Sequence, residues 1–312
     1  MVKLFKNIFL FLLFFIGVVL LVVLLPDPPR WNDSLHYVQV DKDSLMQNVE
    51  DPRLILLGGS NVGMSIDSQM LKDSLGVNPV NGGSHAGFGL KFMLDNAAQY
   101  LRSGDVVVVI PEYEQYDLNS FYGDVDLLKL LFDVAPEKIR LVNFEQSKHI
   151  LTLIPSYIKI KLLPSSYFYR RASRPMAYLK SAYNVYGDAV AHWDDRNIGQ
   201  IELLPLAERP EMASVAYLAG WIQAQKEKGV IVYLSYPAFE KKNYESSIGC
   251  ISQVDSLIRA KDVNVLGFPE DFVMDESYFY DTRYHMNRKG VELRTEKIVR
   301  LLSAEKDKIG KE

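Results

Sequence analysis

Two short segments near opposite ends of the chain carry the residue types that nucleophilic catalysis needs. Ser60 follows an apolar run and two glycines, which places it on the turn after a predicted strand. Asp281 and His285 lie together shortly before the last amphipathic stretch. A serine hydroxyl is a weak nucleophile, and an imidazole that a carboxylate orients can act as its base. The alternative interpretation is a turn serine, a turn-capping aspartate and a surface histidine.

A glycine-rich loop at residues 81–89 is a third candidate for chemistry. Four of its nine residues are glycines, and it follows a short strand pattern. Backbone N–H groups in such a loop could face a ligand and stabilise a developing oxyanion. His85 lies inside this loop and is a rival base. Its position favours a structural or substrate-contacting role.

The elements that must position these residues alternate between strand and helix patterns. Strands are predicted at residues 54–57, 79–80, 106–110, 230–235 and 263–268, and helices at 67–75, 90–101, 212–227, 246–260 and 287–302. This alternation predicts an α/β domain with a mainly parallel sheet, helices on both faces and ligands at the carboxyl ends of the strands. We expect that domain to occupy residues 51–312.

Residues 116–209 interrupt the alternation and are rich in aromatic residues and prolines. They predict a large insertion over the sheet edge, of the kind that forms lids or binding surfaces. Within it, residues 146–187 contain no acidic residue. Seven basic residues occur there: Lys148, Lys159, Lys161, Arg170, Arg171, Arg174 and Lys180. The pattern favours a positive surface for anionic headgroups, an anionic glycan or a membrane partner, with an ordinary solvated face as the alternative.

The N-terminal region predicts a membrane anchor. Residues 8–25 carry no polar side chain and would span about 27 Å as a helix, close to the thickness of the hydrocarbon core. Pro26 follows directly, without a small-residue cleavage site, so we expect an uncleaved anchor. Lys3 and Lys6 favour a cytoplasmic location for residues 1–7 and an extracytoplasmic one for the domain. Residues 26–50 are predicted to form a stalk.

Composition disfavours several kinds of protein. The net charge of −4 over 312 residues argues against nucleic-acid binding, which normally requires a basic surface. Cys250 is the single cysteine, which excludes an internal disulfide and a zinc site built from cysteines. The histidines are scattered without metal-ligand spacing, and we expect neither a metal nor a cofactor.

Taken together, the Ser60 turn, the glycine loop and the Asp281/His285 pair resemble the SGNH (GDSL-like) hydrolase superfamily. The resemblance covers most of residues 53–302 and rests on chain order, with the serine after the first strand and the Asp/His pair before the last helix. It implies a three-layer α/β/α, flavodoxin-like fold. It also implies a catalytic triad of Ser60, Asp281 and His285, with the N–H groups of Ser60 and Gly87 in the oxyanion hole.

The sequence departs from that superfamily at two points. The superfamily usually places two residues between its aspartate and histidine, whereas three separate Asp281 from His285. Its third block carries an oxyanion asparagine, whereas the corresponding strand here is followed by Pro-Glu-Tyr-Glu at residues 111–114. One side-chain donor is therefore missing. Asn61 or backbone N–H groups are candidates to replace it, and Glu112 could instead bind substrate hydroxyls.

An N-terminal span before such a domain resembles the extracytoplasmic partners of membrane-bound O-acyltransferases. This resemblance implies serine-dependent acyl transfer, with acetyl as the expected group, onto a cell-envelope glycan through an acyl-enzyme. Two alternatives stay open. One is a carbohydrate or lipid esterase that works alone, and the other is a non-catalytic glycan-binding or assembly subunit with the same fold.

Overall fold

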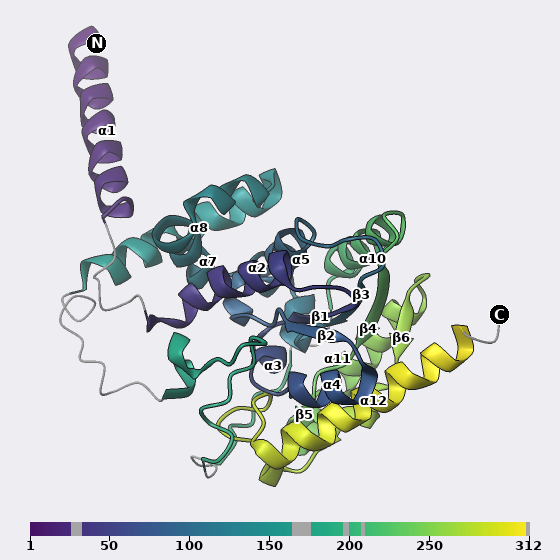
Figure 1. Ribbon diagram of the computed structural model, residues 1–312. Helices are drawn as coiled ribbons and strands as arrows, with labels where there is room; N and C mark the ends of the chain where they lie inside the picture. Colours follow the sequence, from purple (N-terminus) through teal and green to yellow (C-terminus); the bar gives the residue numbers. More distant parts are fainter. Residues whose placement is uncertain (26–32, 164–175, 196–199, 207–209, 310–312) are drawn as a thin grey trace.

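A central parallel sheet of five strands organises the domain (Figure 1). The computed structural model describes residues 1–25, 33–163, 176–195, 200–206 and 210–309. The strands lie in the order β2-β1-β3-β4-β6, and all four neighbouring pairs are parallel. Their bounds are β1 Arg53–Gly58, β2 Asn78–Asn81, β3 Val106–Ile110, β4 Ile231–Ser235 and β6 Asn264–Leu266. By chain order the arrangement is 2-1-3-4-5, a doubly wound order whose switch point lies between β1 and β3.

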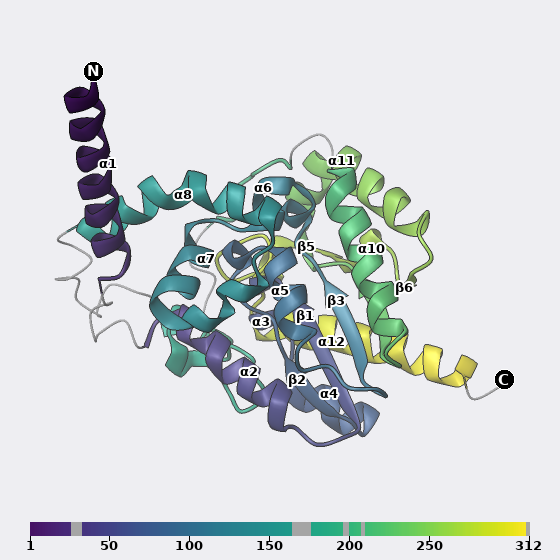
Figure 2. The same cartoon turned by 90° about the horizontal axis from the view of Figure 1, so that it is seen from above.

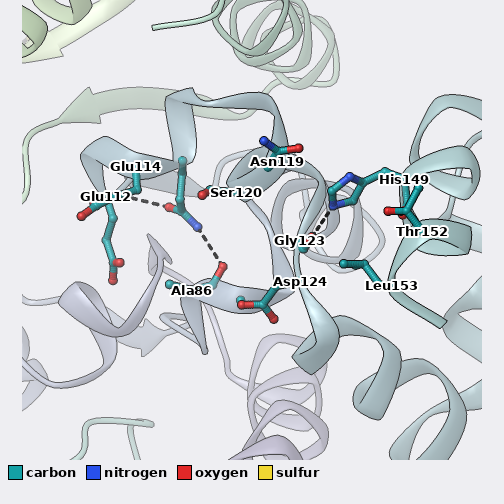
Figure 3. Close-up of a pocket in the computed structure, with 12 residues that line it drawn as sticks. Ala86, Glu112, Glu114, Asn119, Ser120, Gly123, Asp124, His149, Thr152 and Leu153 are labelled. Carbon is teal, nitrogen blue, oxygen red and sulfur yellow. Dashed lines mark hydrogen bonds between the residues drawn. The ribbon is translucent and has the colours of Figure 1, made fainter. Parts of the chain in front are cut away.

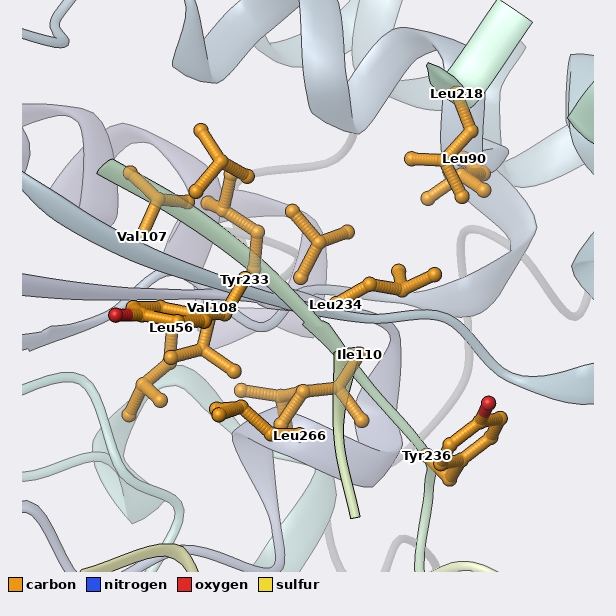
Figure 4. Close-up of a cluster of buried hydrophobic side chains, with 14 of the residues drawn as sticks. Leu56, Leu90, Val107, Val108, Ile110, Leu218, Tyr233, Leu234, Tyr236 and Leu266 are labelled. Atoms are coloured by element: carbon orange, nitrogen blue, oxygen red, sulfur yellow. The ribbon is translucent and has the colours of Figure 1, made fainter. Parts of the chain in front are cut away.

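The strands form because their residues are apolar on both faces of the sheet. Leu56 of β1 lies in register with Val108 of β3, and both side chains are fully buried. Figure 4 shows these strands with Leu90 of α5 (Leu90–Ala97) and Leu218 of α10 (Met212–Lys226) packed over them. Continuous apolar runs of this kind are characteristic of parallel strands that are covered on both sides.

Helices cover both faces of the sheet, as the alternating pattern predicts. α5 and α10 lie on one face, and α4 (Ser68–Leu75) and α12 (Arg288–Ile309) lie on the other (Figures 1 and 2). Some helices begin or end at other residues than predicted, because a side chain caps the helix end. Helix α11 (Lys241–Arg259) begins five residues before the predicted start, because the Glu240 carboxylate accepts hydrogen bonds from the N–H groups of Lys242 and Asn243.

The prediction of a stalk at residues 26–50 is wrong for the part that the structure describes. A short 3₁₀ turn (Leu35–Tyr37) leads into helix α2 (Val38–Asn48), which packs on the domain with Val38 and Met46 buried. The buried Lys42 ammonium donates to the carbonyl oxygens of Gly83 and Gly187. Burial lowers the pKa of Lys42 to about 7.

The N-terminal helix α1 (Val2–Val23) is long and apolar enough to cross a membrane. It starts within the predicted cytoplasmic segment and ends shortly before the predicted end of the span. Its last turn lies against α8 (Phe144–Leu162), which runs across the base of α1 (Figures 1 and 2). The Lys161 ammonium donates to the Val23 carbonyl oxygen over 3.0 Å and pairs with Asp133 over 2.6 Å.

The predicted insertion between β3 and β4 is largely helical where it is described. It contains α6 (Leu118–Tyr122), α7 (Val125–Lys129) and α8, followed by the irregular segment 176–195. A second apolar core joins its helices to α5. That core includes Phe88, Phe92, Leu127, Leu131 and Tyr157.

The predicted positive surface of the insertion is smaller than its sequence suggests. Lys161 is buried against Asp133, while Lys148 pairs with Glu145 and Lys180 pairs with Asp41. These acidic partners lie outside residues 146–187, so the absence of acid in that stretch overstates its charge. Arg170, Arg171 and Arg174 lie outside the described residues.

Candidate active site

The candidate site lies at the carboxyl edge of the sheet, where β1 and β3 end side by side. Gly58 at the end of β1 is in register with Ile110 at the end of β3. Ser60 begins the short helix α3 (Ser60–Gly63), and Glu112 follows β3. A Cβ atom at Gly59 would lie 2.5 Å from Oε1 of Glu112, so a larger residue here would displace the Glu112 carboxyl group from Ser60.

The three residues that the sequence predicts as a triad are brought together. Oγ of Ser60 lies 2.8 Å from Nε2 of His285, and Nδ1 of His285 lies 2.8 Å from Oδ1 of Asp281. The His285 side chain is nearly buried, whereas Ser60 is partly exposed. These distances suit transfer of a proton from Ser60 to His285.

The three-residue spacer does not separate Asp281 from His285, because the loop that carries them is closed on itself. Phe279 and Met286 form an antiparallel bridge, and the Tyr280 N–H donates to the His285 carbonyl oxygen over 2.8 Å. The His285 N–H donates to Oγ1 of Thr282 over 3.1 Å. The turn thus accommodates the extra residue and returns His285 to the side of Asp281.

Asp281 has a second partner that sequence reasoning missed. The hydroxyl of Tyr178, from the insertion, donates to Oδ2 of Asp281 and lies 3.1 Å from Nδ1 of His285. Burial opposes ionisation of Asp281, but hydrogen bonds from His285 and Tyr178 hold its pKa below the usual value. Burial and the neighbouring carboxylate raise the pKa of Tyr178. Tyr178 lies in a segment without periodicity, so no sequence signal marks it.

Two further contacts hold the Asp281–His285 loop against the Ser60 turn. Oγ of Ser65 donates to the Tyr284 carbonyl oxygen over 2.8 Å and accepts from the Met286 N–H over 3.1 Å. Nε2 of His192 lies 3.1 Å from the Met64 carbonyl oxygen and 3.0 Å from that of Met286. The Ser65 bonds join segments more than two hundred residues apart in the chain, and His192 links the same two segments from the insertion. These buried bonds hold His285 in position.

Glu112 contacts the candidate nucleophile directly. Its Oε1 lies 2.9 Å from Oγ of Ser60 and 3.0 Å from the backbone nitrogen of Asn61. Its own N–H donates to Oε1 of Gln115 over 3.0 Å. The side chain is buried, and burial together with the neighbouring Glu114 raises the pKa of Glu112.

The residues expected at an oxyanion hole are placed differently from the prediction. The Gly87 N–H donates to Nδ1 of its own loop residue His85 over 3.1 Å and is therefore already used, because His85 caps a 3₁₀ turn. The Asn61 side chain is buried and donates to the Ile110 carbonyl oxygen over 3.1 Å. The Asn61 backbone N–H, next to Ser60 in the chain, donates to Oε1 of Glu112 over 3.0 Å. Nε2 of His85 faces Oδ2 of Asp126, 3.9 Å away, and His285 is the histidine that Ser60 contacts.

A cavity of about 540 Å³ begins at Glu112 and extends to α8. Figure 3 shows Glu112 at one end and His149 and Thr152 of α8 at the other. Most of its lining residues have polar side chains, including Glu114, Gln115, Asn119, Ser120 and Asp124, although the larger part of the exposed lining surface is apolar. Hydroxyls, amides and carboxylates spread over one cavity wall can hydrogen-bond a polyhydroxylated molecule.

Comparisons with known proteins do not extend this description. No protein-family model matches the sequence, and no match was found among curated proteins.

Proposed function

We propose that this chain is a serine-dependent acyl-transfer enzyme that acts through an acyl-enzyme on Ser60. The observation that carries the proposal is the continuous chain of contacts from Ser60 through His285 to Asp281, with both distances at 2.8 Å. Nucleophile, base and orienting carboxylate in this order are the arrangement that activates a serine hydroxyl. Their position at the carboxyl edge of a parallel sheet, beside its switch point, is where ligands bind in such folds.

The reaction would proceed in two displacement steps. Oγ of Ser60 attacks the acyl carbonyl carbon while its proton moves to Nε2 of His285, and the carbonyl electron pair moves to the oxygen. The tetrahedral intermediate collapses as the leaving oxygen takes the proton from His285. An acceptor hydroxyl then attacks the carbonyl carbon of the acyl-enzyme as its proton moves to Nε2 of His285. The second tetrahedral intermediate collapses as the bond to Oγ of Ser60 breaks, and Oγ takes that proton back from His285.

The fold supports membership of the SGNH hydrolase superfamily as part of this proposal. The flavodoxin-like strand order, a serine after the first strand and an Asp/His loop before the last helix all agree with it. The departure after β3 remains, because Glu112 lies beside Ser60 where the superfamily has an asparagine. The role of Glu112 is taken up below.

The cavity beside Glu112 favours a sugar hydroxyl as acceptor. Among the described residues, the side chains of Asn119 and Ser120 have no hydrogen-bond partner, so both could bind substrate hydroxyls. Asp124 is an acidic side chain in the wall, Glu114 is paired with Arg283, and no lysine or arginine of the described ranges lines the cavity, which favours a neutral over an anionic glycan segment. Transfer and hydrolysis share the acyl-enzyme, so an esterase that uses water as acceptor is the alternative.

The anchor helix supports a location at the cell membrane. α1 is long and apolar enough to span it, and Lys3 and Lys6 at its start favour an N-terminus in the cytoplasm. The catalytic domain would then face the outside, next to cell-envelope glycans and to a membrane-bound acyl donor system. A cysteine at the exposed Asp195 position should react with an impermeant maleimide in intact cells, and failure to react would contradict this orientation.

Covalent labelling tests the enzymatic role. A fluorophosphonate probe should label the wild type at Ser60, and Ser60→Ala should abolish labelling. Ser60→Ala and His285→Ala should each remove nearly all hydrolysis of 4-nitrophenyl acetate, and the double variant should lose little more, because the residues act as one unit. Full activity in Ser60→Ala would instead favour a non-catalytic glycan-binding subunit.

A further inference from the structure

The Ser60 hydroxyl has one proton and two neighbours that can accept it. Nε2 of His285 lies 2.8 Å away on one side, and Oε1 of Glu112 lies 2.9 Å away on the other. Attack on an acyl group requires that the proton point toward His285. The charge on Glu112 therefore decides whether the nucleophile is correctly oriented.

An ionised Glu112 would direct the proton the wrong way. A carboxylate only accepts hydrogen bonds, so it would receive those of both the Asn61 N–H and the Ser60 hydroxyl. Nε2 of His285 would then have to donate to Ser60 and could not take its proton. A negative charge would also lie beside the position where an oxyanion forms.

A neutral Glu112 satisfies every group in the chain. Its oxygen accepts from the Asn61 N–H, and its own proton points to Oγ of Ser60. Ser60 then donates to Nε2 of His285, and Nδ1–H of His285 donates to Asp281, which also accepts from Tyr178. In this arrangement Asp281 is the only charged member of the chain.

We propose that Glu112 is a catalytic residue that works as an uncharged acid and donates a hydrogen bond to the oxyanion. It lies after β3, at the position where the SGNH superfamily that this chain resembles has its oxyanion asparagine. The Gly87 N–H donates to His85 and the Asn61 N–H donates to Glu112 itself, so both of these N–H groups already have an acceptor. This inference rests on the proposed acyl-enzyme function.

Groups from each neighbouring element act on the charge of Glu112, and together they raise its pKa and so favour the neutral acid. Burial comes first and Glu114 second among the causes that raise its pKa, while the Asn61 N–H and His285 oppose them. The buried Arg294 guanidinium of α12 also favours a carboxylate, and burial lowers the pKa of Arg294 to about 9. Tyr284, from the loop that carries Asp281 and His285, also lies near Glu112, and its raised pKa keeps it uncharged.

In the acylation step Glu112 keeps its proton. Ser60 forms the new C–O bond and transfers its proton to His285, and the carbonyl electron pair moves to the oxygen. The Glu112 hydroxyl turns from Oγ of Ser60 to that oxygen and stabilises its charge. On collapse the C=O bond re-forms, and the leaving oxygen takes the proton from His285, so Glu112 ends unchanged.

The test is the pH profile of 4-nitrophenyl acetate hydrolysis by the full chain in detergent micelles. Wild-type kcat/KM should fall at high pH as Glu112 ionises. Glu112→Gln offers a neutral amide donor, so it should retain activity within about tenfold of the wild-type maximum and lose the alkaline fall. Glu112→Ala offers no donor and should lose about 10²- to 10³-fold, the usual effect of removing one oxyanion donor.

Glu114→Gln provides a second test that leaves the contacts of Ser60 intact. It removes a negative charge that raises the pKa of Glu112 and frees Arg283, its ion-pair partner. The alkaline fall should therefore move to lower pH in this variant, and circular dichroism should show that the fold is kept. An unmoved fall would overturn the inference.

The remaining outcomes separate this inference from the proposed function. If Glu112→Gln is as inactive as Ser60→Ala, Glu112 acts as an anion or base and the inference is wrong, while Ser60 keeps its role. Identical alkaline limbs in the wild type and Glu112→Gln would also overturn it. Activity in Ser60→Ala would instead defeat the proposed function itself.

Discussion

The hydroxyl of Tyr178 donates to Oδ2 of Asp281, while Oδ1 of the same carboxylate is held by His285. Both oxygens of Asp281 are thus fixed, one by His285 of its own loop and one by Tyr178 of the insertion. A carboxylate restrained at both oxygens cannot rotate away from the imidazole. The insertion therefore takes part in the geometry of the site and is more than a cover over it.

Tyr178→Phe should lower kcat of ester hydrolysis by about tenfold and leave KM nearly unchanged. The change removes one hydrogen bond to a charged group, and such bonds contribute about 1.5–3 kcal/mol. Tyr186→Phe is the matched control, because that hydroxyl bonds Gln69 at an exposed position in the same segment. Equal rates in Tyr178→Phe and the wild type would show that His285 alone positions Asp281.

Ser120→Leu should reduce acyl transfer to a neutral oligosaccharide such as chitotriose without slowing the hydrolysis of 4-nitrophenyl acetate. Ser120 lines the cavity beside Glu112 and makes no hydrogen bond with Ser60. A bulky apolar side chain there would exclude the acceptor and leave the nucleophile free. Ser252→Leu, on the exposed face of α11, should change neither reaction. Equal transfer by all three proteins would place the acceptor elsewhere.

Lys42→Met should change how stability depends on pH. The folded pKa of about 7 lies below the ordinary 10.5, so between these values the unfolded chain binds more protons at this residue. Its contribution therefore makes the free energy of unfolding rise with pH, by at most about 1.4 kcal/mol per pH unit. Urea denaturation from pH 7 to 10 should show this rise in the wild type and in Lys72→Met, the matched control for Lys42→Met. A rise of the same slope in Lys42→Met would contradict the assignment.

The outer face of α8 should contribute to membrane contact. Phe144, Leu151 and Leu162 are exposed apolar residues on this helix, which lies across the base of α1. In a chain that starts at residue 33, Phe144→Ser with Leu151→Ser should weaken cosedimentation with anionic vesicles several-fold. Ile248→Ser removes a comparably exposed apolar side chain from α11 and should have no effect. Unchanged binding in the double variant would leave α1 as the sole membrane contact.

The sheet and the meeting of Ser60 with His285 could be predicted because local patterns determine them. Apolar strands such as β3 mark the sheet, and chain order alone places Ser60 and the Asp281 loop at the same edge. Tyr178 could not be predicted, since its contact depends on how an aperiodic segment folds back. Helix α2 could not be predicted either, because it buries polar residues such as Lys42, which in the sequence are typical of a solvent-exposed segment. Gly87 was misplaced because a side chain of its own loop captures its N–H.

The hydrogen bond from Lys161 to the Val23 carbonyl oxygen joins the last turn of α1 to the domain. A domain on a flexible linker would take many heights and tilts relative to a bilayer. The Lys161 contact with Val23, held by the ion pair with Asp133, restricts this motion. With α1 in a membrane, Ser60 would be held at one distance from the membrane surface and in one orientation. Acyl donors would have to be delivered to that point, and only polymer segments that pass through the same thin layer would be modified.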